Sequence, residues 1–256
     1  MKPVLAIAGL VIKEIFRKKD FYVALVLIGV ILFYAQGLQF YNVKNISRYL
    51  MEIGLALIYL FSVILTLALT ARQYPSEIQN RTGPILFAKP IRRSQFVLGK
   101  YLGAFFAGGA AFTIFYVFFL TIVWSKVGQI SLVLAFQAFY LFLLNLMLVS
   151  AMASFFSYGL TVSANVTISL VIYILISTYG VGLRESAGGF SLPVRWACEA
   201  LYFSWPHFEF FDLRHRFIHD WPGLSPVLLA ALTAYALFYT IVFLILGSLS
   251  IRRRPL

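Results

Sequence analysis

Six apolar runs, each about as long as a membrane-crossing helix, constrain this 256-residue chain more than any other feature. The runs cover residues 21–38, 50–71, 101–124, 130–157, 160–183 and 227–251. A helix of about 20 apolar residues is long enough to cross the hydrocarbon core of a bilayer. Only 12% of the residues are charged, against about 25% in a typical soluble domain. The sequence therefore predicts an all-α membrane protein with six transmembrane helices, in a single transmembrane domain over residues 1–256.

A basic segment separates the second apolar run from the third. Residues 72–100 read RQYPSEIQNRTGPILFAKPIRRSQFVLGK and form the only long polar interruption in the first two-thirds of the chain. They carry six Lys and Arg side chains against a single acid, Glu77. Basic loops between apolar spans are typical of the cytoplasmic side of a membrane. We therefore expect residues 72–100 in the cytoplasm, where a soluble partner can dock on them.

The distribution of basic residues predicts the orientation of the whole chain. With both termini in the cytoplasm, the inner segments hold fourteen Lys and Arg residues and the outer segments hold seven. This asymmetry favours cytoplasmic termini. The turn near Gly159, between the fourth and fifth runs, carries no charge, and without it the chain would have five spans and an outer C-terminus. The basic residues 252–254 argue against that alternative, because such clusters prefer the cytoplasm.

Residues 1–20 have the pattern of a helix that lies in the membrane interface. One side of this helix is apolar, while Lys2, Lys13 and Arg17 fall on the opposite side. The apolar stripe comprises Val4, Leu5, Ala8, Val11, Ile12, Ile15 and Phe16. Such a helix keeps its charges among the lipid headgroups and buries its apolar side. The simpler interpretation is a cytosolic anchor that precedes the first span.

Residues 184–226 form the largest predicted outer segment and contain five of the nine acidic residues. Within it, VRWACEALYFSW is too short and too charged to cross a membrane, and Trp196, Tyr202 and Trp205 suit the membrane interface. We expect short re-entrant helices that dip into the outer leaflet before the last span. The alternative is a folded outer loop that has no role in transport.

Motifs for chemistry within this chain are missing. The phosphate-binding sequence GxxxxGK[ST] does not occur, so we expect that the chain is not an ATPase. Ionisable residues are scarce in the apolar runs, which counts against an ion-driven carrier. Asn145 in the fourth run is expected to bond to a neighbouring helix, and contact with cargo is the alternative. His215 and His219 have metal-ligand spacing, but without a HExxH glutamate we interpret them as interfacial or solvent-facing. The sequence thus predicts no catalytic residues and no metal site.

Small residues recur every fourth position at the start of the third run, at Gly99, Gly103, Ala107 and Ala111. They form a helix face along which another helix can approach closely. Ordinary intramembrane packing is the plain interpretation. The alternative is that this face, which begins where the basic segment ends, transmits movement of the segment into the membrane.

The order of residues resembles a known family, the permease subunits of ATP-binding-cassette (ABC) exporters of the type-2 class. The matching positions are Glu77, Arg81, Thr82, Leu86, Ala88, Lys89, Pro90, Arg93, Phe96, Gly99 and Lys100. IAGLVIKEIFRKKDF near the N-terminus and PHFEFFDLR before the last run are also similar. The sequence departs from the family pattern at Gly83 and Pro84, where a larger apolar residue is expected after Thr82, so the gate helix is expected to begin later, near Ile85.

The resemblance implies roles for particular residues. Residues 1–20 become an elbow helix, and residues 72–100 become a coupling and gate segment seated on a separate ATPase subunit. Coupling to the ATPase falls to Glu77, Ile78, Arg81 and Thr82. The gate segment contains Lys89, Pro90, Arg93, Gly99 and Lys100, and helix packing falls to Gly103, Ala107 and Ala111. Glu77 and Arg81, four residues apart, can instead pair with each other and have no coupling role.

The resemblance also implies partners and a location. We expect a permease in the bacterial inner membrane, paired with a second copy or a related permease and with an ATPase subunit that binds ATP and Mg²⁺. This chain needs no cofactor of its own, and a periplasmic component fits the same picture. The net charge of +12 is explained by membrane topology and anionic lipids rather than nucleic acid. The competing hypothesis is a membrane scaffold or a mechanotransmission subunit that does not transport.

Overall fold

The computed structural model describes residues 2–17, 22, 26, 29–30, 46–75, 93–127, 131–186, 196 and 205–252. All regular elements in these ranges are helices. They are α1 (Lys2–Arg17), α3 (Ile46–Ala71), α6 (Arg93–Val127), α7 (Leu132–Ser157), α8 (Val162–Ser186), the short 3₁₀ helix η2 (Phe208–Phe211), α10 (Arg214–Ile218) and α11 (Pro226–Arg252).

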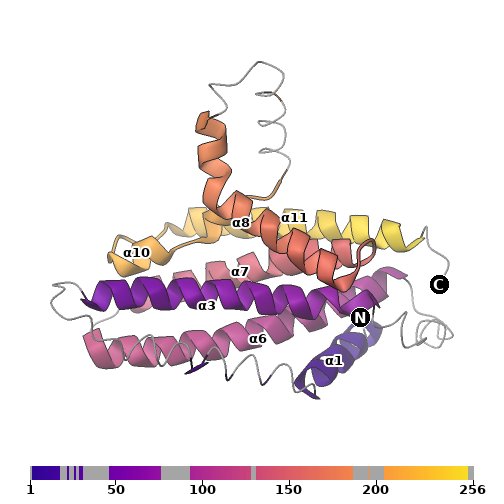
Figure 1. The fold of residues 1–256 in the computed structure, drawn as a ribbon, viewed down its shortest axis with the longest axis horizontal. Coiled ribbons are helices and arrows are strands. Elements are labelled where there is room, and N and C mark those ends of the chain that lie inside the picture. Colours follow the sequence, from indigo (N-terminus) through magenta and orange to yellow (C-terminus); the bar gives the residue numbers. More distant parts are fainter. Residues whose placement is uncertain are drawn as a thin grey trace.

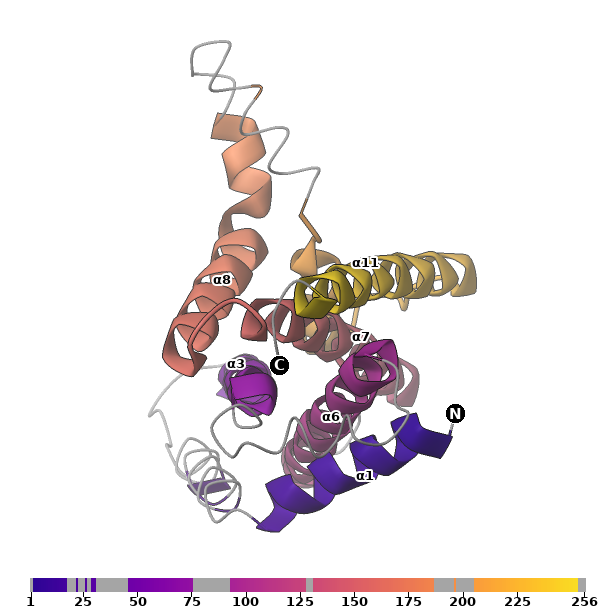
Figure 2. The ribbon, with the colours of Figure 1, turned by 90° about the vertical axis from the view of Figure 1, so that its right-hand side faces the viewer.

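Four long helices run side by side along the longest axis of the molecule (Figure 1). These are α3, α6, α7 and α11, and α1 lies across one end of α6 (Figures 1 and 2). Both chain termini lie at that same end (Figure 1). Helix α8 starts beside the end of α7, crosses the bundle obliquely, and then bends so that its last turns point away from the other helices (Figures 1 and 2).

Four helices are long and apolar enough to cross a membrane. They cover Met51–Pro75, Arg93–Ser125, Leu132–Ser157 and Pro226–Ile251, close to the predicted second, third, fourth and sixth spans. The predicted fifth span corresponds to α8, in which Val162–Ser177 is a shorter apolar helix. The predicted first span, 21–38, falls outside the described residues except at four positions. The chain is thus an all-helical protein with the composition of a membrane protein, and the total of six spans stays a prediction.

The third predicted span is longer than its apolar run. We expected it to begin at Tyr101, after a polar segment, but α6 already begins at Arg93. No Pro or Gly lies between Arg93 and Gly99 to interrupt a helix. Phe96 and Val97 are buried there, at 3% and 1% exposure, and packing of these two side chains stabilises the extra turns. The end of the basic segment is therefore part of the long helix.

The uncharged turn between α7 and α8 is built from local hydrogen bonds. Helix α7 ends at Ser157, and the amide of Gly159 donates to the carbonyl of Phe156 at 3.0 Å. The Thr161 hydroxyl then accepts from the amide of Ala164, at 3.4 Å, at the start of α8. The two apolar runs are separate helices, as expected.

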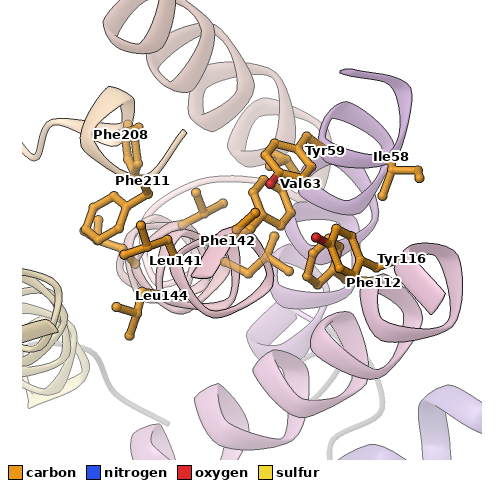
Figure 3. Packing of buried hydrophobic residues seen from close by; sticks show 14 of the residues in the cluster. Ile58, Tyr59, Val63, Phe112, Tyr116, Leu141, Phe142, Leu144, Phe208 and Phe211 are labelled. Atoms are coloured by element: carbon orange, nitrogen blue, oxygen red, sulfur yellow. The ribbon is translucent and has the colours of Figure 1, made fainter. Parts of the chain in front are cut away.

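Aromatic side chains fill the core between α3, α6 and α7. Phe142 of α7 stacks on Tyr59 of α3, with ring centroids 3.7 Å apart, and lies 4.6 Å from the ring of Phe112 of α6. Figure 3 shows Phe211 of η2 beside Leu141, on another side of α7. Because lipid tails are as apolar as the core, helices in a membrane associate mainly through such close packing and through interhelical hydrogen bonds.

Candidate functional site

Five elements meet in a small apolar cluster at the end of the bundle that holds both termini, and we call this cluster the terminal junction. It is separate from the main core. Its buried members are Ile7, Tyr74, Phe96, Val97, Tyr158 and Ile251. They come from α1, the residues just after α3, the start of α6, the residue that follows α7 and the end of α11. A shift of the first turns of α6 would therefore change the packing of all of these elements.

Helix α1 packs on the small-residue face of α6. A Cβ atom built on Gly99 would lie 2.7 Å from Cβ of Ile7, and one built on Gly103 would lie 2.5 Å from Cβ of Val11. Both glycines are therefore needed for this close approach, since any side chain would push α1 away. Farther along the same face, Ala107 and Ala111 are buried, at 1% and 0% exposure.

The buried face of α1 differs in part from the predicted stripe. Ile7, Ala8, Val11 and Ile15 are buried against the protein. Leu5, which we placed on the stripe, is 63% exposed. The reason is that Ile7 and Val11 pack against Gly99 and Gly103 of α6, and this contact determines which side of α1 is buried.

Two basic residues of the gate segment belong to the junction. Arg93 donates a hydrogen bond from Nη1 to the carbonyl oxygen of Ile251, at 2.9 Å. This bond ties the start of α6 to the end of α11. Lys100 is only 6% exposed, and its Nζ lies 5.9 Å from the centre of the Phe96 ring. The Lys100 side chain therefore packs within the protein rather than projecting freely from the start of a span.

The remaining predicted coupling residues lie outside the described residues. These are Glu77, Ile78, Arg81, Thr82, Lys89 and Pro90, all within residues 76–92. The structure describes the chain on both sides of them. It leaves after Tyr74 and Pro75 and returns at Arg93. Because Tyr74, Phe96 and Val97 share one cluster, the segment starts and ends at the terminal junction.

A second feature is the segment Trp205–Ile218, which enters the interior of the bundle. The Trp205 ring lies 6.1 Å from Phe243 of α11, and the Phe208 ring lies 5.1 Å from Tyr173 of α8. The amide of His207 donates to the hydroxyl of Tyr235 of α11 at 2.9 Å. Contacts to residues well inside the lengths of α8 and α11 place this segment among the helices, not across their ends.

This segment carries a partly buried ion pair. Arg214 donates from Nε to Oδ1 of Asp212 at 2.9 Å and from Nη2 to Oδ2 at 2.6 Å. Burial lowers the pKa of the Arg214 guanidinium, but the hydrogen bonds and charge of Asp212 raise it more, so the pKa lies above its usual value. The guanidinium is therefore charged at neutral pH.

Polar side chains of three helices are linked to this ion pair or to the segment that carries it. The guanidinium carbon of Arg214 lies 5.6 Å from the centre of the Tyr59 ring of α3. Tyr173 of α8 contacts the same segment through Phe208, with ring centroids 5.1 Å apart. Asn145 of α7 donates from Nδ2 to the Tyr173 hydroxyl at 3.1 Å, which confirms the expected bond to a neighbouring helix. We call these five residues, Asp212, Arg214, Tyr59, Tyr173 and Asn145, the central polar site.

Two atoms of the central polar site have no hydrogen-bond partner. The Tyr59 hydroxyl and Oδ1 of Asn145 are both buried and unpaired, in residues that are 4% and 2% exposed. An unpaired polar group in the interior is costly. By contrast, the side chains of Asp212 and Arg214 keep 27% and 33% of their surface accessible. The ion pair is thus partly exposed, whereas the two unpaired atoms are buried.

The histidines do not converge on a metal site within the described residues. His207 is 7% exposed, and its Nδ1 lies 3.1 Å from Oε1 of Glu209. His215 is exposed, and the exposed His219 stacks on Trp221 with ring centroids 5.6 Å apart. The last two therefore lie where we interpreted them, away from the core.

Sequence reasoning missed the central polar site, although it noted the motif PHFEFFDLR. The apolar runs themselves are poor in ionisable groups, as expected. The motif, however, brings His207, Glu209, Asp212 and Arg214 inside the bundle. The available signal was the alternation of charged and aromatic residues, which suits a segment packed among helices better than a free loop.

No protein-family model and no curated protein matches this sequence.

Proposed function

We propose that this chain is the membrane-spanning permease subunit of an ATP-driven exporter of the ABC type-2 class. It would work with a separate ATPase subunit that binds ATP and Mg²⁺, and with a second copy of itself or a related permease. The chain would cross a bacterial inner membrane six times, with both termini in the cytoplasm. The single observation that carries the proposal is the terminal junction, into which both ends of the basic segment are built.

The geometry suggests how work done on the segment reaches the membrane. A push on residues 76–92 acts on Pro75 and Arg93, because these residues flank the segment. Arg93 is the first residue of α6 and is bonded to the end of α11. Gly99 and Gly103 then seat α1 on α6 without clearance. Helices α1, α6 and the end of α11 would therefore move as one body when the partner ATPase closes on ATP.

Single-cysteine labelling tests the orientation. Replacing the only cysteine, Cys198→Ser, gives a background in which Glu77→Cys is introduced. A membrane-impermeant maleimide should label this residue from the cytoplasmic side alone. Labelling from the outer side would contradict the proposed topology.

Cross-linking tests the partner. An ATPase subunit with a GxxxxGK[ST] loop, co-expressed with the chain, should co-purify with it and cross-link to Glu77→Cys. Glu77→Arg should lower stimulated ATP hydrolysis, whereas Glu52→Arg, near the start of α3, should not. Absence of any bound ATPase would overturn the proposal. Hydrolysis without transport of any solute would favour the mechanotransmission alternative.

A further inference from the structure

We propose that the central polar site binds a zwitterionic group, one that carries a primary ammonium and a phosphate or carboxylate. A role for this binding in transport rests on the proposed function. The binding itself does not, because it can be measured on the full chain without any ATPase.

The net charge of the site is the starting point. Asp212 and Arg214 neutralise each other through two bonds of 2.9 and 2.6 Å. An anion alone would leave Asp212 without its partner, and a cation alone would do the same to Arg214. A ligand with both charges replaces the Asp212–Arg214 pair by two new pairs, its cation with Asp212 and its anion with Arg214. Every charge then has a partner, which buried charges require.

The unpaired atoms match the same ligand. Oδ1 of Asn145 is an acceptor, as is the Asp212 carboxylate, so these two groups suit an ammonium. The Tyr59 hydroxyl can donate, as does the Arg214 guanidinium, so these two suit an anion. Both unpaired atoms are buried. One ligand would therefore supply hydrogen bonds that the protein itself does not.

The ion pair is accessible in part. Asp212 and Arg214 are 27% and 33% exposed, although the Arg214 guanidinium lies over the ring of Tyr59, near the middle of α3. If the exposed part of the pair faced hydrocarbon in the membrane, it would be costly. A polar ligand that covers the pair removes that cost. The ligand can come from the bilayer, as a phosphatidylethanolamine headgroup, or from solution, as a small zwitterion.

The test measures binding to the purified full-length chain. The chain in detergent is incubated with phosphatidylethanolamine or phosphatidylglycerol, and retained lipid is counted by native mass spectrometry. Binding of glycylglycine is measured in parallel by calorimetry. We expect phosphatidylethanolamine to be retained about tenfold better than the anionic lipid, because each lost charge-assisted hydrogen bond weakens binding by about that factor.

Matched variants separate the site from general effects. Asp212→Asn and Arg214→Gln should lose the preference, whereas Arg216→Gln should keep it. Arg216 lies two residues away, but its Nη1 donates to the Pro222 carbonyl instead. Tyr59→Phe should weaken binding severalfold, whereas Tyr140→Phe, which removes a hydroxyl bonded to Thr233, should not.

The outcomes are distinct. If only glycylglycine binds, with the same variant pattern, the ligand class stands and its source is solution. If phosphatidylglycerol is retained equally well, or if Arg214→Gln binds like Arg216→Gln, the inference fails. Neither failure touches the ATPase cross-link, so the proposed function would be judged separately.

Discussion

The terminal junction and the central polar site are held together by different forces. At the junction, the glycines of α6 leave no space between α1 and α6, and apolar side chains packed together are supplemented by one hydrogen bond, from Arg93 to the Ile251 carbonyl. In the central polar site, charges and hydroxyls meet and two polar atoms lack partners. The comparison teaches that the first region resists any change of volume, while the second depends on which polar groups are present. The predictions below test this contrast, from the largest expected effect to the smallest.

A leucine at position 103 should cause the largest effect. Gly103→Leu places atoms where Val11 and the Ala8 carbonyl lie, and overpacking of this kind costs about 1–3 kcal/mol or more. We expect α1 to leave α6. Maleimide labelling of Ile7→Cys in a Cys198→Ser background would detect this, because position 7 is only 4% exposed while α1 is packed on α6. ATP hydrolysis should become uncoupled from transport, with assembly retained.

Gly109→Ala is the matched control on the same helix. A Cβ at Gly109 would meet only the end of the Leu143 side chain, at 3.4 Å, so the substitution should be tolerated. Normal transport in Gly103→Leu would show that the close fit of α1 has no role in coupling.

Removing one charge of the central ion pair should have the next largest effect. Asp212→Asn leaves the partly buried Arg214 without its counter-charge, which we expect to lower stability by about 2 kcal/mol, between the values for exposed and buried pairs. Thermal unfolding of the purified chain would measure the change. Arg216→Gln should shift the unfolding temperature much less, and equal shifts would mean that the pair contributes nothing beyond surface charge.

Loss of the bond between α6 and α11 should cost less. Arg93→Gln removes the hydrogen bond to the Ile251 carbonyl, which is worth about 1 kcal/mol at a partly exposed position. Hydrogen exchange at the C-terminal end of α11 should become faster. Unchanged exchange there would indicate that the apolar contacts of Ile251 are sufficient to hold α11.

The smallest effect should have the opposite sign. Tyr59→Phe deletes a buried hydroxyl that has no partner, so the empty protein should be unchanged or stabilised by up to about 1 kcal/mol. Asn145→Leu should destabilise by a similar amount, because it leaves the Tyr173 hydroxyl without its donor. A thermal melt of each purified variant distinguishes the two. A clearly destabilised Tyr59→Phe would mean that a bound solvent molecule or ligand already satisfies the hydroxyl.

Much of the helical framework follows from the sequence because a bilayer demands long apolar helices. The predicted range 130–157 compares with α7 at Leu132–Ser157, and 227–251 compares with α11 at Pro226–Arg252. The start of α6 was harder to predict, since hydrophobicity alone ignores an amphipathic extension such as Arg93–Lys100. Which side of α1 is buried was also not decidable locally, because Gly99 and Gly103 belong to another helix.

The central polar site could not be predicted for a different reason. Its members come from four separate elements, at positions 59, 145, 173, 212 and 214. Each taken alone has an ordinary explanation, such as an interfacial tyrosine or an outer-loop charge. These residues form a site only because the fold brings them close together. Periodicity and composition do not predict which distant segments lie close together.

The length of α6 has a mechanical consequence. Its 35 residues amount to about 52 Å at about 1.5 Å per residue, while the hydrocarbon layer is about 30 Å thick. Part of this continuous helix must therefore extend beyond the hydrocarbon layer. The charges of Arg93 and Lys100 place some of the extra length at its N-terminal end. If the protruding N-terminal part of α6 tilts, the C-terminal end moves in the opposite direction. The pivot is the point at which neighbouring helices hold α6. The length of the helix on each side of that pivot then sets how far its C-terminal end moves.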